Sequence, residues 1–262
     1  MSNPVQLGLR ANAAQFSLLI GLNALVGAMV GLERSVLPLV GKDDFGLESS
    51  AAILAFVLTF GAAKALSNLA SGELAERFGR KRLLVLGWVL VLPVAPLIAL
   101  APSWWYIVGA NILLGASQGF AWSMTVVMKI DLAGPRRRGL ALGLNEAAGY
   151  LGVALAAFVS GALAASYAPR TVIWIGAAVV SMVGLLLSIF AVRDTSAHVA
   201  YEQSSRGDAA AFSRMQERDG LRSRVGGRSQ LVPSASDSHL SRAARFRHGC
   251  ESGAAARDGD TT

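Results

Sequence analysis

Ionisable and polar side chains stand inside long apolar runs of this chain, where each needs a physical reason. Glu33 and Arg34 lie late in the first run, Lys64 in the second, and Glu146 early in the fifth. Asn111 adds a polar amide to the fourth run. Charged groups in such surroundings are costly, so they usually pair with one another or face a water-filled cavity. We therefore expect these five side chains to line a pathway for a polar solute.

Depth estimates, at about 1.5 Å of rise per residue, arrange these residues in two layers. Lys64 and Glu146 each lie about 9 Å from the same end of their runs, which predicts an inner pair. Glu33, Arg34 and Asn111 lie about 10–12 Å from the opposite end and form an outer layer. Other interpretations stay open. Glu33 and Arg34 suit a structural ion pair or snorkelling, Glu146 suits the headgroup level if its helix begins later, and Asn111 suits a hydrogen bond between helices.

Six apolar runs would position these side chains, and each is about as long as a bilayer-spanning helix. They cover residues 16–40, 49–70, 83–101, 103–127, 140–166 and 171–192. Only 16% of the 262 residues are charged, against roughly 25% in soluble domains. We expect an all-α membrane protein with six transmembrane helices over residues 15–195, preceded by a short cytoplasmic segment, 1–14.

Two features of the runs predict their shape. The third run contains Pro93 and Pro96, which predict a kink because proline lacks the N–H that a helix interior needs. The fifth run carries small residues at fourfold spacing, and such rows let helix backbones approach closely. These residues are Gly152, Ala156, Ser160 and Ala164.

Basic residues in the loops indicate which side of the membrane each loop faces. Ten lysines and arginines fall on one side, counting Lys129 and the residues around it as loop, and two, Lys42 and Arg170, fall on the other. Because cytoplasmic loops carry the excess, we expect both termini in the cytoplasm and a multi-pass protein of the cell inner membrane. This topology explains the net charge of +7 without a nucleic-acid partner.

Residues 196–262 differ from the rest in composition. They are rich in Ser, Arg, Gly, Ala and Asp and contain ten arginines but no lysine. They lack an apolar face, so we expect a disordered cytoplasmic tail. Its arginine bias leaves open a native tail or translation of a shifted reading frame. The one cysteine, Cys250, and the three histidines lie in or beside it, and no nucleotide-binding loop or nucleophile elbow occurs, so no metal, cofactor or enzymatic activity is expected.

A charged motif, SGELAERFGRKRLL, fills residues 71–84 between the second and third runs. It reads as a glycine, an acidic residue four positions on, a basic residue, a spacer, a second glycine and two basic residues. The pattern and its place after the second of six spans resemble the signature of the major facilitator superfamily of secondary transporters. Its positions here are Gly72, Glu76, Arg77, Gly79, Arg80 and Lys81.

The resemblance implies that this loop is a gate, because in the family it helps to lock two halves together on the cytoplasmic side. Glu76, where the family usually has aspartate, would pair with a basic side chain and with the positive end of a facing helix. Two family features are absent. Gly115 occupies the place of an arginine ahead of Gln118, and the fifth run has no Gly-Pro motif. Neither proton coupling nor drug export is therefore supported by a motif.

The family is built from two six-helix halves around a central site, and this chain supplies one half. We expect a transporter that moves a small solute, with a coupling ion as a further candidate, by alternating access across the lipid bilayer. A homodimer partner or a separate chain would then supply the second half. Two alternatives remain open: a truncated product that lacks transport activity, and a non-transporting membrane assembly protein.

Overall fold

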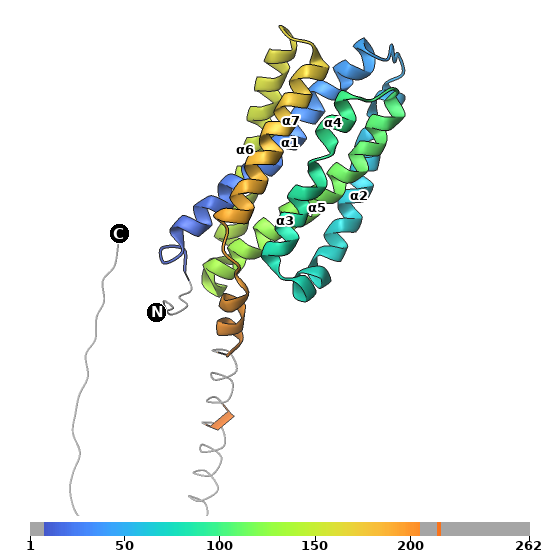
Figure 1. Ribbon diagram of the computed structural model, residues 1–262. Helices are drawn as coiled ribbons and strands as arrows, with labels where there is room; N and C mark the ends of the chain where they lie inside the picture. Colours follow the sequence, from blue (N-terminus) through green and yellow to red (C-terminus); the bar gives the residue numbers. More distant parts are fainter. Residues whose placement is uncertain (1–7, 205–213, 216–262) are drawn as a thin grey trace, which may run out of the picture. The chain divides into compact units, whose positions relative to one another are not determined.

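The computed structural model describes residues 8–204 and 214–215, and the chain divides into two units, Met1–Ala210 and Ala211–Thr262. The described part of the first unit is a bundle of helices (Figure 1). In the second unit, the described residues Arg214 and Met215 are helical. The rest of the predicted tail, 205–213 and 216–262, lies outside the described residues.

The bundle contains seven labelled α-helices and one short 3-10 helix, and none of its described residues forms a strand. Along the chain these are α1 (Ala13–Asp43), α2 (Ser50–Phe78), α3 (Arg80–Val91), α4 (Val94–Ala99), α5 (Trp104–Ala133), η1 (Pro135–Arg137), α6 (Arg138–Ala164) and α7 (Pro169–Phe190). Residues 196–204, predicted as the start of a disordered tail, are helical.

Five stretches of the described chain are long and apolar enough to cross a membrane: α1, α2, α3 with α4, η1 with α6, and α7. The predicted all-helical membrane fold is therefore confirmed. The sixth expected span corresponds to α5, which has 30 residues but is not among the five. Its hydropathy is lowered by Asn111, Gln118, Lys129 and Asp131, all of which are buried. Protein rather than lipid surrounds the polar part of α5.

The third apolar run is broken in two, as its prolines predict. α3 ends at Val91, and α4 begins at Val94 with Pro93 as its N-cap residue. Pro93 cannot donate to the preceding turn, so the hydrogen-bond ladder stops there and resumes one turn later. The break leaves α3 packed on α5 and brings α4 against both α5 and α7.

α1 and α6 pack so closely that their backbones touch. A Cβ atom built on Gly152 would lie 2.9 Å from the carbonyl carbon of Ala24 and 3.0 Å from its Cα, and closer still to its oxygen. Gly27 faces the backbone of Gly149 in the same way. Only residues without a side chain allow this approach. The row of small residues in the fifth run therefore marks a helix contact, as predicted.

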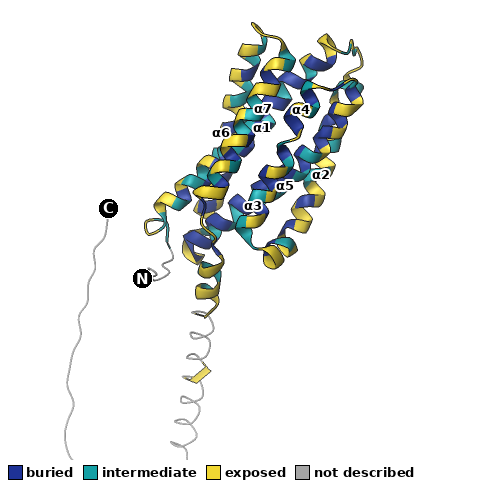
Figure 2. Cartoon of the chain, in the orientation of Figure 1, coloured by how far each residue is buried: buried dark blue, intermediate teal, exposed yellow. Residues whose placement is uncertain are grey.

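The outer surface of the bundle is apolar. Large side chains on α2, α6 and α7 are exposed, among them Leu69, Phe158 and Phe190. Figure 2 shows exposed residues along these helices, with buried residues where helices meet. Such a surface suits a bilayer, in which apolar side chains need no further cover.

Candidate functional site

α5 presents a row of polar side chains to α1. Gln118 Nε2 donates a hydrogen bond to the carbonyl oxygen of Val26 (3.0 Å), and Lys129 Nζ donates to that of Leu19 (3.0 Å). Thr125 lies between them on the same helical face. Lys129 is fully buried, with 0% of its surface exposed, so its assignment to a loop from the sequence was wrong. Its long apolar stem and its hydrogen bond to the Leu19 carbonyl make this burial tolerable.

A chain of hydrogen bonds leads from this row to Glu146 on α6. Thr125 Oγ1 donates to Asn23 Oδ1 (2.9 Å), and Asn23 Nδ2 donates to the carbonyl oxygen of Asn145 (2.7 Å). Asn145 Nδ2 and Trp122 Nε1 then donate to the same Glu146 oxygen, at 3.0 and 3.1 Å. The half-buried Glu146 carboxylate is thus held against α5 by hydrogen bonds.

Trp122 lies between Lys64 and Glu146. Lys64 Nζ lies 4.5 Å from the centroid of the Trp122 ring, while the N–H of that ring donates to Glu146. Glu146 still attracts Lys64 electrostatically. Among the described residues, however, the two do not form the direct ion pair that their depths predicted, since no such pair occurs within 4.0 Å. The indole instead contacts both groups, Lys64 through its ring face and Glu146 through its N–H.

The outer layer is divided between two faces of α1. Glu33 is buried with 3% exposure, whereas Arg34 points toward α2 and lies 5.2 Å from the Phe60 ring centroid. Within residues 8–204 the two do not form an ion pair, so the structural-pair interpretation loses its support. Asn111 Nδ2 donates to the carbonyl of Ile107 (3.0 Å). Glu33 Oε1 and Asn111 Oδ1 are both buried without a hydrogen-bond partner in the described chain.

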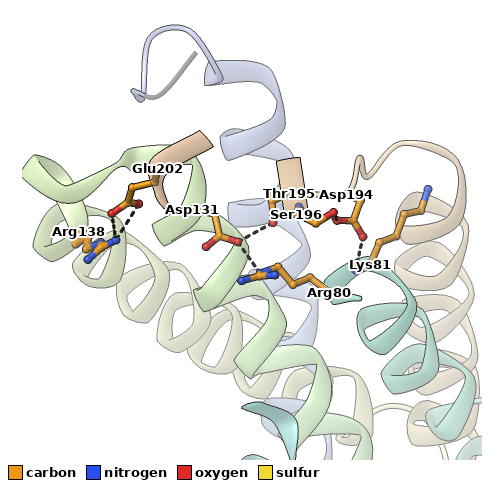
Figure 3. Close-up of polar contacts among 8 residues, drawn as sticks. All are labelled: Arg80, Lys81, Asp131, Arg138, Asp194, Thr195, Ser196 and Glu202. Carbon is orange, nitrogen blue, oxygen red and sulfur yellow. Dashed lines mark hydrogen bonds and ion pairs between the residues drawn. The ribbon is translucent and has the colours of Figure 1, made fainter. Parts of the chain in front are cut away.

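Gly79 forms the turn in the motif between α2 and α3. This residue has a φ of 87°, a conformation that favours glycine, and it both ends α2 and begins α3. Directly after it, Arg80 Nε lies 2.7 Å from Asp131 Oδ2 on α5. Thr195 Oγ1 donates to the same oxygen at 2.7 Å (Figure 3). Asp131 thus ties the loop to α5 and to the segment after α7.

Lys81, the last position of the motif, binds the last turn of α7 and the segment that follows it. Its Nζ donates to the carbonyl oxygen of Ile189 (2.8 Å), and its N–H donates to Asp194 Oδ2 (3.4 Å). Partial burial opposes ionisation of Asp194, but hydrogen bonds from Ser196 and from the Lys81 N–H outweigh it and lower the pKa of Asp194. Further along, Arg138 Nη2 contacts both carboxylate oxygens of Glu202, at 2.7 and 2.9 Å (Figure 3).

The first half of the motif lies on the open surface. Glu76 is exposed, and a Cβ built on Gly72 would meet nothing within 4 Å. Arg77 contacts Glu73 at 3.7 Å, but both side chains are at least 70% exposed, so the pair contributes little. The structure therefore connects the second half of the motif to the bundle and leaves the first half accessible.

Two residues of this site escaped the sequence analysis. Trp122 follows Gln118 by four positions and precedes Thr125 by three, so the helical spacing of the polar row would have found it. Asp131 stands beside a basic loop. In the sequence, the signal for this residue is an acidic side chain next to several basic ones. The missing family arginine also has a reason here. Any side chain at Gly115 would collide with the α2 backbone, because a built Cβ lies 3.1 Å from the Lys64 nitrogen and closer still to the Phe60 carbonyl oxygen.

Residues 9–237 match the sequence profile of the Major Facilitator Superfamily. The chain belongs to this superfamily. The match covers most of the chain and extends beyond residues 15–195, into the segment after α7. The relatives below carry transport or resistance names, in accord with the expectation that this superfamily member is not an enzyme.

Three curated relatives illustrate the similarity. The chain is 32% identical over 176 residues to a 3-(3-hydroxy-phenyl)propionate transporter of Escherichia coli (strain K12), covering 64% of this chain and 42% of that protein. It is 28% identical to a probable 4-methylmuconolactone transporter of Cupriavidus pinatubonensis, covering 57% and 35%. It is 31% identical to the multidrug resistance protein MdtG of Enterobacter lignolyticus, covering 63% and 40%. The chain thus spans less than half the length of these relatives.

Proposed function

We propose that this chain forms one half of a secondary transporter that moves a small solute across the inner membrane by alternating access. The observation that carries the proposal is the convergence of ionisable side chains from three helices on two aromatic rings. Arg34 of α1 and Lys64 of α2 lie over Phe60, and Trp122 contacts Lys64 through its ring face and Glu146 through its N–H. Charges that deep in an apolar bundle usually serve a solute or ion.

A second half would complete the site, since transporters of this type bind solute near the midplane between two repeats. The exposed Glu76 supports this arrangement. Its predicted role is to pair across the interface, and within the described residues it has no ion-pair partner. We propose that Gly72, Glu76 and Arg77 contact the second half, while Arg80 and Lys81 hold the loop in position.

We further propose that the Gly79 end of the bundle faces the cytoplasm, with both chain termini on that side. The support is the concentration of arginine and lysine in the short connections at this end, a bias that sets orientation during insertion. The ion pair of Arg80 with Asp131 would then fix the loop on the cytoplasmic face.

The names of the relatives point to different solutes, but two of them name small organic compounds. A direct test therefore uses one of these compounds, 3-(3-hydroxyphenyl)propionate, in radiolabelled form with the full chain reconstituted in liposomes. We expect uptake above that of empty liposomes and its loss in Lys64→Gln. The matched variant Lys42→Gln changes an exposed lysine at the end of α1 and should transport normally. Absence of uptake, repeated with 4-methylmuconolactone, would favour the truncated, inactive product.

The second half can be tested in the same membranes. In a Cys250→Ser background, a Glu76→Cys variant should form a disulfide-linked dimer if two copies meet at this loop. A matched Asp43→Cys variant, at the far end of α1, should remain monomeric. Efficient transport by a protein that never crosslinks and runs as a strict monomer would contradict the homodimer.

A further inference from the structure

We propose that the face formed by Arg34, Phe60, Lys64, Trp122 and Tyr150 binds a small organic anion with a flat apolar body. We refer to it as the Phe60–Trp122 face. The inference rests on the proposed function, because the same face would lie on the solute pathway. It goes further by naming the charge and shape of the solute.

Two cations share this face without a carboxylate of their own. Arg34 Cζ and Lys64 Nζ lie 5.2 and 5.8 Å from the centroid of the Phe60 ring, and the two repel each other electrostatically. Within residues 8–204, neither has a carboxylate oxygen within 4.0 Å. Like charges held close in a partly desolvated place are unfavourable, and an anion between them would relieve the repulsion.

Neither nearby carboxylate forms a direct ion pair with these cations. Glu146 accepts hydrogen bonds from Trp122 and Asn145, and it interacts electrostatically with both Lys64 and Lys129. Glu33 is buried beside Asn111 and acts on Arg34 only electrostatically.

The repulsion between Arg34 and Lys64 favours a negatively charged ligand. A cationic ligand would add a further positive charge to this face, and a neutral solute would leave the repulsion in place.

The apolar part of the ligand has an aromatic wall beside the cations. Trp122 and Tyr150 meet edge to face with ring centroids 6.1 Å apart, and Tyr150 is 66% exposed. A flat ring would pack along this wall while its carboxylate reaches Lys64, because aromatic pairs prefer offset or edge contacts over this range of separations. The face therefore supplies one charged end and one apolar end, as an aryl carboxylate requires.

Benzoate, benzamide and benzylamine give a test, since they share one ring and differ in charge. The full-length protein is purified in a neutral detergent, and ligand binding is followed by tryptophan fluorescence and by the midpoint of thermal unfolding. We expect benzoate to bind and raise the midpoint, and the other two compounds to bind at least tenfold more weakly, about 1.4 kcal/mol. Equal binding of benzoate and benzamide would overturn the proposal.

Variants of Lys64 and Arg34 test whether benzoate binds at the Phe60–Trp122 face. Lys64→Gln should weaken benzoate at least tenfold, Lys64→Arg should retain it within threefold, and Lys42→Gln should bind normally. If Lys64→Gln fails to fold, Arg34→Gln compared with Arg34→Lys applies the same reasoning to the second cation. Unchanged affinity in a folded glutamine variant would place the anion elsewhere. Stabilisation by vesicles of phosphatidylglycerol, with none by benzoate, would assign the cations to lipid and also overturn the proposal.

Binding and flux are measured separately, so the two proposals can fail independently. Benzoate binding that depends on Lys64, without solute flux in liposomes, would refute transport and leave the anion site intact. Solute flux that persists in Lys64→Gln, with no binding of benzoate, would refute the anion site and leave transport intact.

Discussion

Replacing Gly152 by alanine should destabilise the bundle because it forces α1 and α6 apart. The new Cβ would lie 2.9 Å from the carbonyl carbon of Ala24 and 3.0 Å from its Cα, against about 3.5–4.0 Å for a comfortable contact. Both obstacles are backbone atoms, so the collision cannot be relieved by a rotamer change. The helices must separate by about 1 Å, at the cost of contacts along their whole length.

The size of the effect follows from comparison with a second glycine of the same helix. Gly161 has nothing within 4 Å of a built Cβ, so Gly161→Ala gains the higher helix propensity of alanine without a collision. Both variants share that gain, and their difference isolates the overpacking, which we expect to be about 2–3 kcal/mol. For a chain of this size, that corresponds to a thermal midpoint lower by about 5–10 °C.

The measurement is reversible unfolding of both variants in mixed micelles, followed by circular dichroism, with thermal unfolding in detergent as a second readout. Gly152→Ala should unfold at lower denaturing detergent and lower temperature than the unaltered protein, and Gly161→Ala should not. Two alanine variants of equal stability would show that α1 and α6 do not rely on direct backbone contact, and the reasoning would fail.

Three other predictions concern the contacts at the Gly79 end. Asp131→Asn should lower the free energy of unfolding in mixed micelles by about 3 kcal/mol, because Arg80 loses its partner in a poorly exposed place; the exposed Asp43→Asn should change it by less than about 0.5 kcal/mol. Thr195→Val should cost about 1 kcal/mol in the same assay, through the lost hydrogen bond to Asp131; an unchanged value would show that the bond contributes nothing. The lowered pKa of Asp194 implies stability that is present above its ordinary value of 3.8 and is lost as pH falls through the lower folded value. Asp194→Asn should therefore flatten the pH dependence of the unfolding midpoint below about pH 4, and an identical pH profile would contradict this.

The arrangement of helices was largely predictable because hydropathy, prolines and small residues act locally. Runs of apolar residues predicted the spans, and the position of Pro93 predicted the break between α3 and α4. The row that includes Gly152 predicted a close helix contact but not its partner. The pairing of helices depends on side-chain complementarity between segments far apart in the sequence. A local sequence pattern does not contain this information.

The site was only partly predictable because depth along a helix does not give direction around it. Lys64 and Glu146 lie at similar depths, yet Trp122 stands between them. Glu33 and Arg34 are neighbours in sequence, and for that reason they point to different faces of α1. Lys129 lies near a basic loop, where its charge suggested exposure, while its hydrogen bond to Leu19 keeps it buried. Each error concerns rotation about a helix axis.

The contact between α1 and α6 has a consequence for biosynthesis. α1 leaves the ribosome before α6, yet its glycine surface is matched by that later helix, which begins only at Arg138. Until that residue has been translated and inserted, the backbone groove on α1 can contact only lipid or earlier helices that do not fit it. α2 packs mainly on α5 in the same way. The contact between α2 and α5 can therefore form before the contact between α1 and α6. The main contact of α1 therefore cannot form until α6 has been translated, and a nascent chain that stalls before α6 leaves α1 without its main partner.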